Sequence, residues 1–381
     1  MEMTKKEFKR EQRARMKEIK KFNSKMYKKY NKDIKRKNIP ESEYLVKMED
    51  DNNILEIDNL QTSFFTDGGT VKAVDGVSFN IPKGMTIGVV GESGCGKSVT
   101  SLSTMRLLQG PQGQIVGGQI RFNDKNTGKA VDITKLPLNE MQKLRGNEIS
   151  MIFQEPMSSL NPVFTIGDQL SEPIILHNKE LKKDEVKNRV IELLIMVGIA
   201  DAEGVYSRYP HELSGGMKQR IVIAMALSCD PQLIIADEPT TALDVTIQAQ
   251  ILDLLRDLKD KVNASIMLIT HDLGVVASMC DYVVVMYAGR VIEQGTVQEI
   301  FKDPKHPYTI GLIKSLPIMN TESDKLYSIP GNVPNPINMP KHCYFKNRCE
   351  QCIDKCSGEY PSIINLTDTH KISCHLYDKD N

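Results

Sequence analysis

The sequence contains no tryptophan, and aromatic residues make up only 6% of its 381 positions. It also lacks any uninterrupted apolar stretch near the roughly 18 residues that suggest a membrane-spanning helix, so we expect no such helix. The N-terminus is charged throughout and lacks the apolar core of a secretory signal. We therefore expect a protein of a reducing compartment, where stable disulfides among its eight cysteines would be rare.

Opposite charges balance over the whole chain but not along it. Lys and Arg number 49, as do Asp and Glu, yet residues 1–40 hold 16 basic against 5 acidic residues. A basic arm thus precedes an acidic body. Apolar residues in the arm are spaced by three or four and predict one thin helical stripe: Ile19, Phe22, Met26, Tyr30 and Ile34. We interpret the arm as a solvated helix or partly disordered tail, with attraction to an anionic membrane surface or a partner as the alternative.

Short apolar runs dominate the chain after residue 51. The segments ILEIDNLQTSFF and VKAVDGVSFNI predict two antiparallel strands joined by a DGG turn. Four later runs are continuous, which indicates parallel strands buried on both faces: 85–90, 232–237, 265–270 and 282–287. We therefore expect an α/β fold in three parts: a basic N-terminal extension (1–50), an α/β core (51–303) and a small C-terminal module rich in proline and cysteine (304–381).

A glycine-rich loop follows the apolar run at 85–90. Residues 91–98 have the pattern GxxxxGKS between a strand and a helical stretch, which is the context that a phosphate-binding P-loop requires. The glycines let backbone N–H groups approach phosphates, and the following helix presents its positive end. Lys97 can reach the β- and γ-phosphates, and the Ser98 hydroxyl can bind Mg²⁺. The loop therefore predicts a nucleoside triphosphate with Mg²⁺.

Two other predicted strands end in residues that could act on such a nucleotide. Asp237 ends the strand LIIAD, where a carboxylate can act on Mg²⁺. Glu238 comes next and is well placed to polarise an attacking water. His271 follows the next strand in LITHD, at the edge of the sheet where ligands bind, and we assign it a γ-phosphate-sensing role.

The segment LSGGMKQR, residues 213–220, predicts a second anion-binding helix terminus. Ser214, Gly215 and Gly216 open a helix whose N–H groups point at its positive end. A single nucleotide does not need two such termini from one subunit. The physical solution is a head-to-tail pair, in which this turn closes on a nucleotide held by the P-loop of the other subunit.

In this order the motifs resemble the ATP-binding cassette (ABC) family, from about residue 54 to 300. The resemblance implies the P-loop NTPase fold of an ABC nucleotide-binding domain: a mixed sheet core with antiparallel β and α-helical subdomains. It also implies an ATP-hydrolysing enzyme that uses Mg²⁺.

The resemblance assigns roles residue by residue. Those implied to be catalytic are Lys97, Gln154 of MIFQEP, Glu238 and His271. Those implied to bind ATP are Phe64, which would stack on adenine, and Gly91, Glu92, Ser93, Gly94, Cys95, Gly96, Lys97, Ser98 and Val99. Those implied to hold Mg²⁺ are Ser98, Gln154 and Asp237. Those implied to reach ATP bound to the other subunit are Ser214, Gly215, Gly216 and, in the D-loop TALD, Asp244.

Longer sequence segments point to one subfamily within the ABC family. The segments FQEPMSSLNP, ADEPTTALDVTIQAQIL, THDLGVVA, HPYT and CYFKNRC look like the ATPase subunits of peptide importers, and most of all like the D-type subunit of an oligopeptide permease. The resemblance implies oligopeptide uptake through two separate membrane permease subunits and an extracellular substrate-binding protein. It implies a second, related ATPase subunit; we expect a heterodimer, and the sequence leaves a homodimer open as the alternative. It also implies a peripheral place at the cytoplasmic face of the cell membrane.

Two alternatives stay open for the function. Dipeptide and nickel or metal-chelate importers share the same motifs. A non-transport ABC ATPase is more remote, because such proteins generally carry two cassettes or a long coiled coil, and this chain has one cassette without sustained heptads. We therefore expect no nucleic acid partner.

Five cysteines gather near the C-terminus: Cys343, Cys349, Cys352, Cys356 and Cys374. Four thiolates suit either tetrahedral zinc or an iron–sulfur cluster, and unliganded buried thiols are the third alternative. Some members of the family hold a [4Fe–4S] cluster on a matching pattern, so the resemblance implies one on Cys343, Cys349, Cys356 and Cys374. Cys352 would then be surplus, although its CxxC spacing with Cys349 makes it a rival ligand. Because so short a module buries little core, a metal there would chiefly fold a C-terminal cap.

Overall fold

The computed structural model describes residues 5–36, 39–125, 127–155, 159–241, 244–316, 327–337 and 339–378. The strands are β1 (Leu45–Val46), β2 (Asn53–Thr66), β3 (Gly69–Pro82), β4 (Thr86–Val90), β5 (Gly113–Asp124), β6 (Lys129–Asp132), β7 (Ile149–Ile152), β8 (Leu233–Asp237), β9 (Ser265–Ile269), β10 (Tyr282–Tyr287), β11 (Arg290–Thr296), β12 (Ile364–Asn365) and β13 (Lys371–Ile372).

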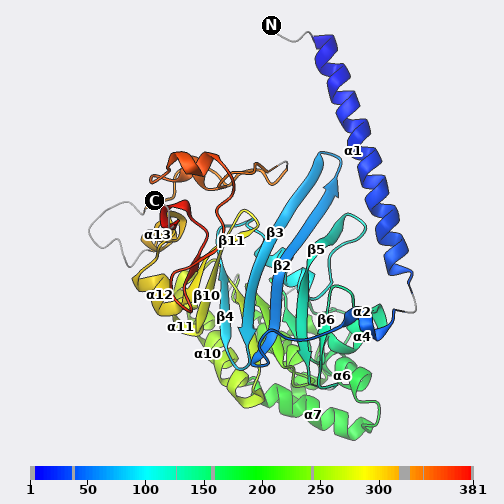
Figure 1. The fold of residues 1–381 in the computed structure, drawn as a ribbon. Coiled ribbons are helices and arrows are strands. Elements are labelled where there is room, and N and C mark those ends of the chain that lie inside the picture. The colour runs from blue at the N-terminus through cyan, green and yellow to red at the C-terminus, as the bar shows by residue number, and fades with distance from the viewer. Residues whose placement is uncertain are drawn as a thin grey trace.

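Helices connect and cover these strands (Figure 1). They are α1 (Lys5–Ile34), α2 (Glu41–Tyr44), α3 (Lys97–Thr104), α4 (Leu138–Leu144), α6 (Ile166–His177), α7 (Lys183–Met196), α8 (Ala202–Tyr206), α9 (Gly215–Ala226), α10 (Val245–Val262), α11 (Leu273–Met279), α12 (Val297–Lys302) and α13 (Pro307–Lys314), with 3₁₀ turns η1 (Pro210–Glu212), η3 (Lys346–Arg348), η4 (Asp354–Ser357) and η5 (His375–Tyr377). None of the described helices is both long and apolar enough to cross a membrane.

The larger sheet has the strand order β12-β13-β11-β10-β4-β9-β8-β7. Its central strands β10, β4, β9, β8 and β7 run parallel. Every residue of β4, β8 and β9 is buried, as continuous apolar strands covered on both faces require. The four parallel strands predicted from apolar runs are therefore confirmed, and their carboxyl ends meet along one edge of the sheet.

The smaller sheet is antiparallel and has the order β1-β6-β5-β2-β3. β2 and β3 form the predicted hairpin, with several bulges where the pairing register shifts. Apolar side chains of this sheet pack against one face of the larger sheet in a shared cluster that includes Ile57, Phe122, Ile235 and Met267. The two sheets therefore form one body beneath the P-loop.

Helices α6 to α10 pack against the far part of the larger sheet around a second apolar cluster. Their ends are set by local chemistry. Thr165 and Asp168 form a capping box at the start of α6, and Asp244 caps α10 through the N–H of Ile247. Helix α9 is tied to the carboxyl end of β8 by the Gln219 amide, which donates to the carbonyl oxygen of Pro239.

The basic arm forms the predicted helix, α1, which runs alongside the β2–β3 hairpin (Figure 1). Most of the arm is exposed, as the prediction of a solvated helix requires, but one face of it contacts the hairpin. The Asn23 amide donates to the carbonyl oxygen of Thr66 at 3.0 Å, and the Tyr27 hydroxyl donates to that of Phe65 at 2.7 Å. The Phe22 ring packs edge-on against Phe65, with centroids 5.8 Å apart. The arm is thus fastened to the hairpin by polar residues as well as by its apolar stripe.

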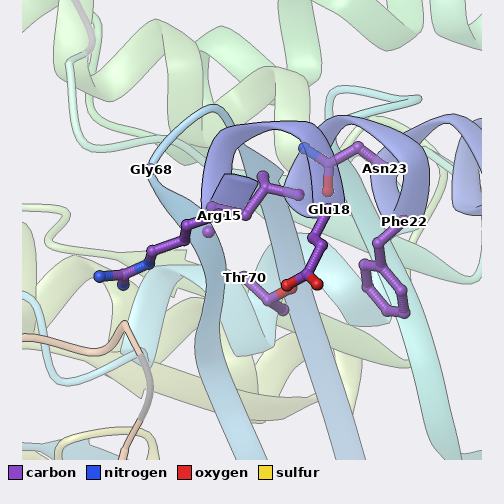
Figure 2. Close-up of a pocket in the computed structure, with 8 residues that line it drawn as sticks. Arg15, Glu18, Phe22, Asn23, Gly68 and Thr70 are labelled. Atoms are coloured by element: carbon purple, nitrogen blue, oxygen red, sulfur yellow. The ribbon is translucent and has the colours of Figure 1, made fainter. Parts of the chain in front are cut away.

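A cavity of about 220 Å³ lies between α1 and the hairpin tip (Figure 2). It is lined by Arg15, Glu18, Ile19, Phe22, Asn23, Gly68, Gly69 and Thr70. None of these is a residue that the sequence assigns to a nucleotide, so this cavity is not the predicted ATP site.

Much of the C-terminal region packs onto the larger sheet. β13, which lies between Cys356 and Cys374, pairs with β11 and so joins this region to the larger sheet. A third apolar cluster combines sheet residues such as Tyr287 with Tyr308, Tyr344 and Phe345. The Tyr287 and Tyr308 ring centroids are 4.8 Å apart. These contacts bring residues 343–349 close to the end of β4.

Candidate nucleotide site

The GxxxxGKS loop lies at the carboxyl end of β4 and leads directly into α3. Gly91 and Gly96 have φ angles of 148° and 101°. A Cβ atom on Gly91 would lie 2.2 Å from the carbonyl oxygen of Met286, and one on Gly96 would lie 2.4 Å from that of Ala73. Only glycine fits at either position, so these two approaches determine the path of the loop.

Lys97 begins α3 and turns its side chain back over the loop. Its ammonium group donates to the carbonyl oxygens of Gly91 at 2.7 Å and Glu92 at 3.2 Å. The residue is only 6% exposed. The loop backbone thus holds a positive charge within it, which suits the binding of an anionic phosphate.

The remaining loop residues differ in how far their side chains are exposed to solvent. Ser93 and Gly94 are exposed, whereas Cys95 is fully buried in the core and Val99 packs against it. Burial raises the pKa of the Cys95 thiol. Cys95 therefore fits the prediction of a small residue that fills space beneath the loop.

Two of the three predicted Mg²⁺ ligands lie together. The Ser98 hydroxyl donates to Asp237 Oδ1 at 3.0 Å, across the gap between α3 and the end of β8. Ser101, on the next turn of α3, contacts the other carboxylate oxygen at 3.5 Å. A hydroxyl and a carboxylate are the oxygen donors that Mg²⁺ prefers, so these residues fit the ion. Ser101 was not predicted, because serine one turn into a helix carries no signal of its own.

The third, Gln154, lies instead in a cluster around Glu238. Its amide donates to Glu238 Oε2 at 3.0 Å, and the Thr241 hydroxyl donates to the same oxygen at 3.0 Å. His271 Nδ1 lies 3.1 Å from Glu238 Oε1. The structure thus brings together three residues that the sequence assigns to catalysis, and it adds Thr241. The segment MIFQEP continues into residues outside the described ranges, as does the middle of TALD.

The backbone of Glu238 is strained. Its φ angle is 47°, in the left-handed region that non-glycine residues rarely adopt. Its N–H donates to the carbonyl oxygen of Ile269 at 2.8 Å, which holds the residue against β9. Strain of this kind persists only where surrounding contacts fix it, and it gathers at functional sites.

The adjacent carboxyl groups of Asp237 and Glu238 are shifted in opposite directions. Burial, together with the charge of Glu238, raises the pKa of Asp237 against the lowering effect of the Ser98 hydroxyl. Burial also acts to raise the pKa of Glu238, but hydrogen bonds from His271 and Thr241 and the charge of Lys97 outweigh it, so that pKa is lowered. Glu238 is thus ionised at neutral pH and able to accept a proton.

The LSGG turn lies on the surface. Ser214 caps α9 by accepting from the N–H of Met217, and Ser214 and Gly215 are exposed. Within the part of the chain that the structure describes, no hydrogen bond or ion pair joins residues 214–216 to the loop at 91–98. Asp244 is also exposed, at the start of α10. The structure therefore does not bring the two glycine motifs of one chain together.

Phe64 lies on the β2 strand opposite Gly113 of β5. A Cβ atom on Gly113 would be 2.8 Å from the Phe64 ring, so the ring covers that glycine. The next residue, Phe65, points the other way and meets α1. Phe64 is thus the member of the pair that faces away from α1.

The C-terminal cysteines are near one another, but the described residues do not arrange them as metal ligands. Burial and the neighbouring thiols Cys343, Cys349 and Cys356 raise the pKa of Cys374 to about 12. Yet in the described residues no group of three or more His, Cys, Asp or Glu side chains is arranged to hold a metal ion. The iron–sulfur and zinc predictions are therefore unsupported by the structure.

The geometry can be compared with known proteins. Residues 74–241 match the family model described as ABC transporter, and residues 292–356 match that of the oligopeptide/dipeptide transporter, C-terminal region. The oligopeptide transport ATP-binding protein AppD of Bacillus subtilis (strain 168) is 53% identical over 327 residues, covering 86% of this chain and 98% of AppD. The chain belongs to the ABC transporter family. As a member, it is an ABC ATPase.

Other members agree with this assignment. The dipeptide transport ATP-binding protein DppD of the same organism is 48% identical over 86% of this chain and 95% of DppD. Among solved structures, the dimeric structure of MJ0796, a bacterial ABC transporter cassette, aligns with a TM-score of 0.56 and 26% identity, over 64% of this chain and 98% of that one. The predicted ABC cassette fold, with mixed and antiparallel sheets and helices, is confirmed.

Replacing Glu238 by Gln tests the assignment of the base. The change keeps the side-chain shape but removes the proton acceptor, so we expect turnover to fall roughly a hundred-fold or more while ATP still binds. Lys97→Ala is the contrasting variant: it removes the cation held by the loop and should weaken ATP binding about ten-fold or more. Steady-state phosphate release and equilibrium ATP titration measure the two effects. Near-normal turnover of Glu238→Gln, or undiminished binding by Lys97→Ala, would contradict the assignment.

Proposed function

We propose that this ABC ATPase powers the uptake of oligopeptides through separate membrane permease subunits. The observation that carries the proposal is the pairing, in one chain, of an ABC cassette with a C-terminal region matching the oligopeptide/dipeptide transporter model. Relatives of similar length bear the names of oligopeptide and dipeptide transport ATP-binding proteins.

In this proposal the loop at 91–98 and Lys97 bind the phosphates of ATP, and Phe64 stacks on its adenine. Mg²⁺, when bound, neutralises charge on the phosphates, and Ser98, Asp237 and Gln154 are the residues that would hold it. Glu238 accepts a proton from the attacking water, since its carboxylate is ionised and Gln154, Thr241 and His271 fix its orientation. His271 is exposed enough to face the terminal phosphate.

The nucleotide is shared between two ATPase subunits in a head-to-tail pair. Ser214, Gly215, Gly216 and Asp244 of one subunit complete the site formed by the P-loop of the other. Two observations support this: the LSGG turn is exposed, and the solved structure of a similar cassette, MJ0796, is dimeric. We expect the second subunit to be a related ATPase, so that the working pair is a heterodimer.

The permease subunits dock beside Gln154, which places the ATPase at the cytoplasmic face of the cell membrane. The segment around Gln154 carries large apolar side chains that are exposed: Phe153, Val163 and Phe164. Exposed apolar residues near one another commonly mark a protein interface. Because Gln154 also contacts Glu238, a partner there could sense the state of the catalytic carboxylate. An extracellular substrate-binding protein would deliver the peptide to the permease.

Dipeptides are the second candidate cargo, since the DppD relatives are nearly as similar as the oligopeptide ones. Uptake of labelled dipeptides and longer peptides by the assembled importer distinguishes the two candidates.

Replacing Phe164 by Asp tests coupling to the permease. We expect ATP hydrolysis by the isolated subunit to stay within about two-fold, because Phe164 lies outside the catalytic cluster, while peptide uptake by the importer in vesicles falls about ten-fold or more. Val116→Asp is the matched control, because Val116 is also an exposed apolar residue but lies on β5. Equal uptake by the Phe164 and Val116 variants would overturn this docking site.

A metal in the C-terminal module stays a prediction, supported only by the nearness of its thiols. A [4Fe–4S] cluster on Cys343, Cys349, Cys356 and Cys374 would give a brown protein after anaerobic purification, and zinc a colourless one with stoichiometric metal. Cys374→Ser should abolish either, whereas Cys352→Ser should not, since Cys352 is exposed and the family pattern leaves it out. A wild-type protein free of iron and zinc would end the prediction.

A further inference from the structure

A buried arginine of the C-terminal region reaches the phosphate loop. Arg348 ends η3, and its guanidinium group donates to both carboxylate oxygens of Glu92, with N···O distances of 2.7 and 2.9 Å. The two residues are 256 positions apart in the sequence. The Arg348 side chain is 5% exposed and that of Glu92 29%. This is a two-pronged ion pair largely shielded from water, a geometry that lysine cannot reproduce.

The guanidinium group is held in place independently of Glu92. Its Nε donates to the carbonyl oxygen of Pro330 at 2.9 Å, and Nη2 to that of Ile329 at 3.3 Å. Nη1 also contacts the Tyr287 hydroxyl at 3.3 Å. The group lies near the faces of the Tyr287 and Phe345 rings, 5.7 and 5.8 Å from their centroids. Arg348 is therefore oriented before it meets the loop, so little side-chain entropy is lost in the pairing.

The loop is held at the same residue from a second C-terminal element. The Glu92 N–H donates to the hydroxyl of Tyr308, on α13, at 2.8 Å. The carbonyl oxygen of Glu92 accepts from Lys97. Glu92 thus joins three parts of the molecule: η3 through its carboxylate, α13 through its N–H, and Lys97 at the start of α3 through its carbonyl oxygen.

The negative charge of Glu92 explains why its pairing with Arg348 matters for the binding of a triphosphate. A carboxylate in a loop that binds a triphosphate would repel the ligand, and partial burial leaves such repulsion weakly screened by salt. The guanidinium charge offsets that repulsion where the loop meets the ligand. The pair therefore both neutralises the loop and fixes its shape.

We propose that Arg348 is a positioning residue for ATP binding, through which the C-terminal region sets the affinity of the phosphate loop. The inference rests on the proposed binding of ATP by that loop. Arg348 immediately precedes Cys349, so the cysteine-rich segment is joined directly to this contact. The C-terminal region is then part of the nucleotide site and not only a cap on the fold.

The test compares Arg348→Gln, Glu92→Gln and the double variant in the full-length chain. Arg348→Gln leaves Glu92 unpaired beside the phosphates, so we expect the Kd and the KM for ATP to rise about ten-fold with kcat little changed. In the double variant the repulsion is gone, and the Kd should return to within about three-fold of wild type. Arg348→Lys keeps the charge but not the double contact and should fall in between.

Lys346→Gln is the matched control, because it removes the same charge from the same 3₁₀ turn, and no contact of Lys346 with the loop is found in the described residues. It should bind ATP as wild type does. Thermal unfolding of each variant establishes that it is folded, and Arg348→Lys provides the test if Arg348→Gln is not.

Two outcomes would overturn the inference. One is an unchanged ATP affinity in Arg348→Gln. The other is a double variant that binds ATP no better than Arg348→Gln, which would show a structural role unrelated to the charge of Glu92. Failure of the ATP site itself is seen separately, as undiminished ATP binding by Lys97→Ala.

Discussion

The close approach of Gly91 and Gly96 to the carbonyl oxygens of Met286 and Ala73 is the constraint on which the site depends. Met286 belongs to β10 of the larger sheet and Ala73 to β3 of the smaller one, so the loop is fixed only where the two sheets meet. Any side chain larger than hydrogen at either glycine would push the loop away from one sheet. The shape of the loop is therefore a product of the tertiary fold and not of the loop sequence alone.

From this loop the site extends along the carboxyl edge of the parallel strands. β8 delivers Asp237 to Ser98, and the strained turn after it delivers Glu238 to Gln154 and His271. Two neighbouring carboxyl groups thus receive different environments. The pKa of the buried Asp237 is raised, while hydrogen bonds lower that of Glu238. A site that must both hold a metal and accept a proton needs two carboxyl groups with different pKa values.

The parallel core and the hairpin could be predicted because their apolar runs are short, continuous and bounded by turns. β5 and β11 were not, because both mix glycine and polar residues with apolar ones. The docking of α1 was missed since it depends on Asn23 and Tyr27, which an apolar stripe does not reveal. Lys97, Glu238 and His271 could be named in advance because each follows a predicted strand of the same sheet edge. Gln154 was named only through the resemblance to the ABC family, since the strand before it, β7, was not predicted.

Other parts of the site had no local signal. Thr241 donates a hydrogen bond to Glu238, but the motif TALD drew attention only to its last residue, Asp244. Arg348 pairs with Glu92 across 256 positions of sequence. Contacts of such long range arise because Tyr308 and Phe345 of the C-terminal region pack on Tyr287 of β10, which periodicity cannot predict. The cysteine spacing, in contrast, was distinctive but did not correspond to a metal site in the described residues.

A nucleotide gripped by two subunits is the central claim, because the LSGG turn and the phosphate loop of one chain do not meet. A structure of the Glu238→Gln variant in the assembled importer, with ATP and Mg²⁺, tests it most directly. We expect each P-loop to face the LSGG turn of the other ATPase subunit, with Ser214 Oγ within hydrogen-bond distance of the γ-phosphate across that interface. A nucleotide enclosed by one chain, with Ser214 remote from every γ-phosphate, would contradict the account.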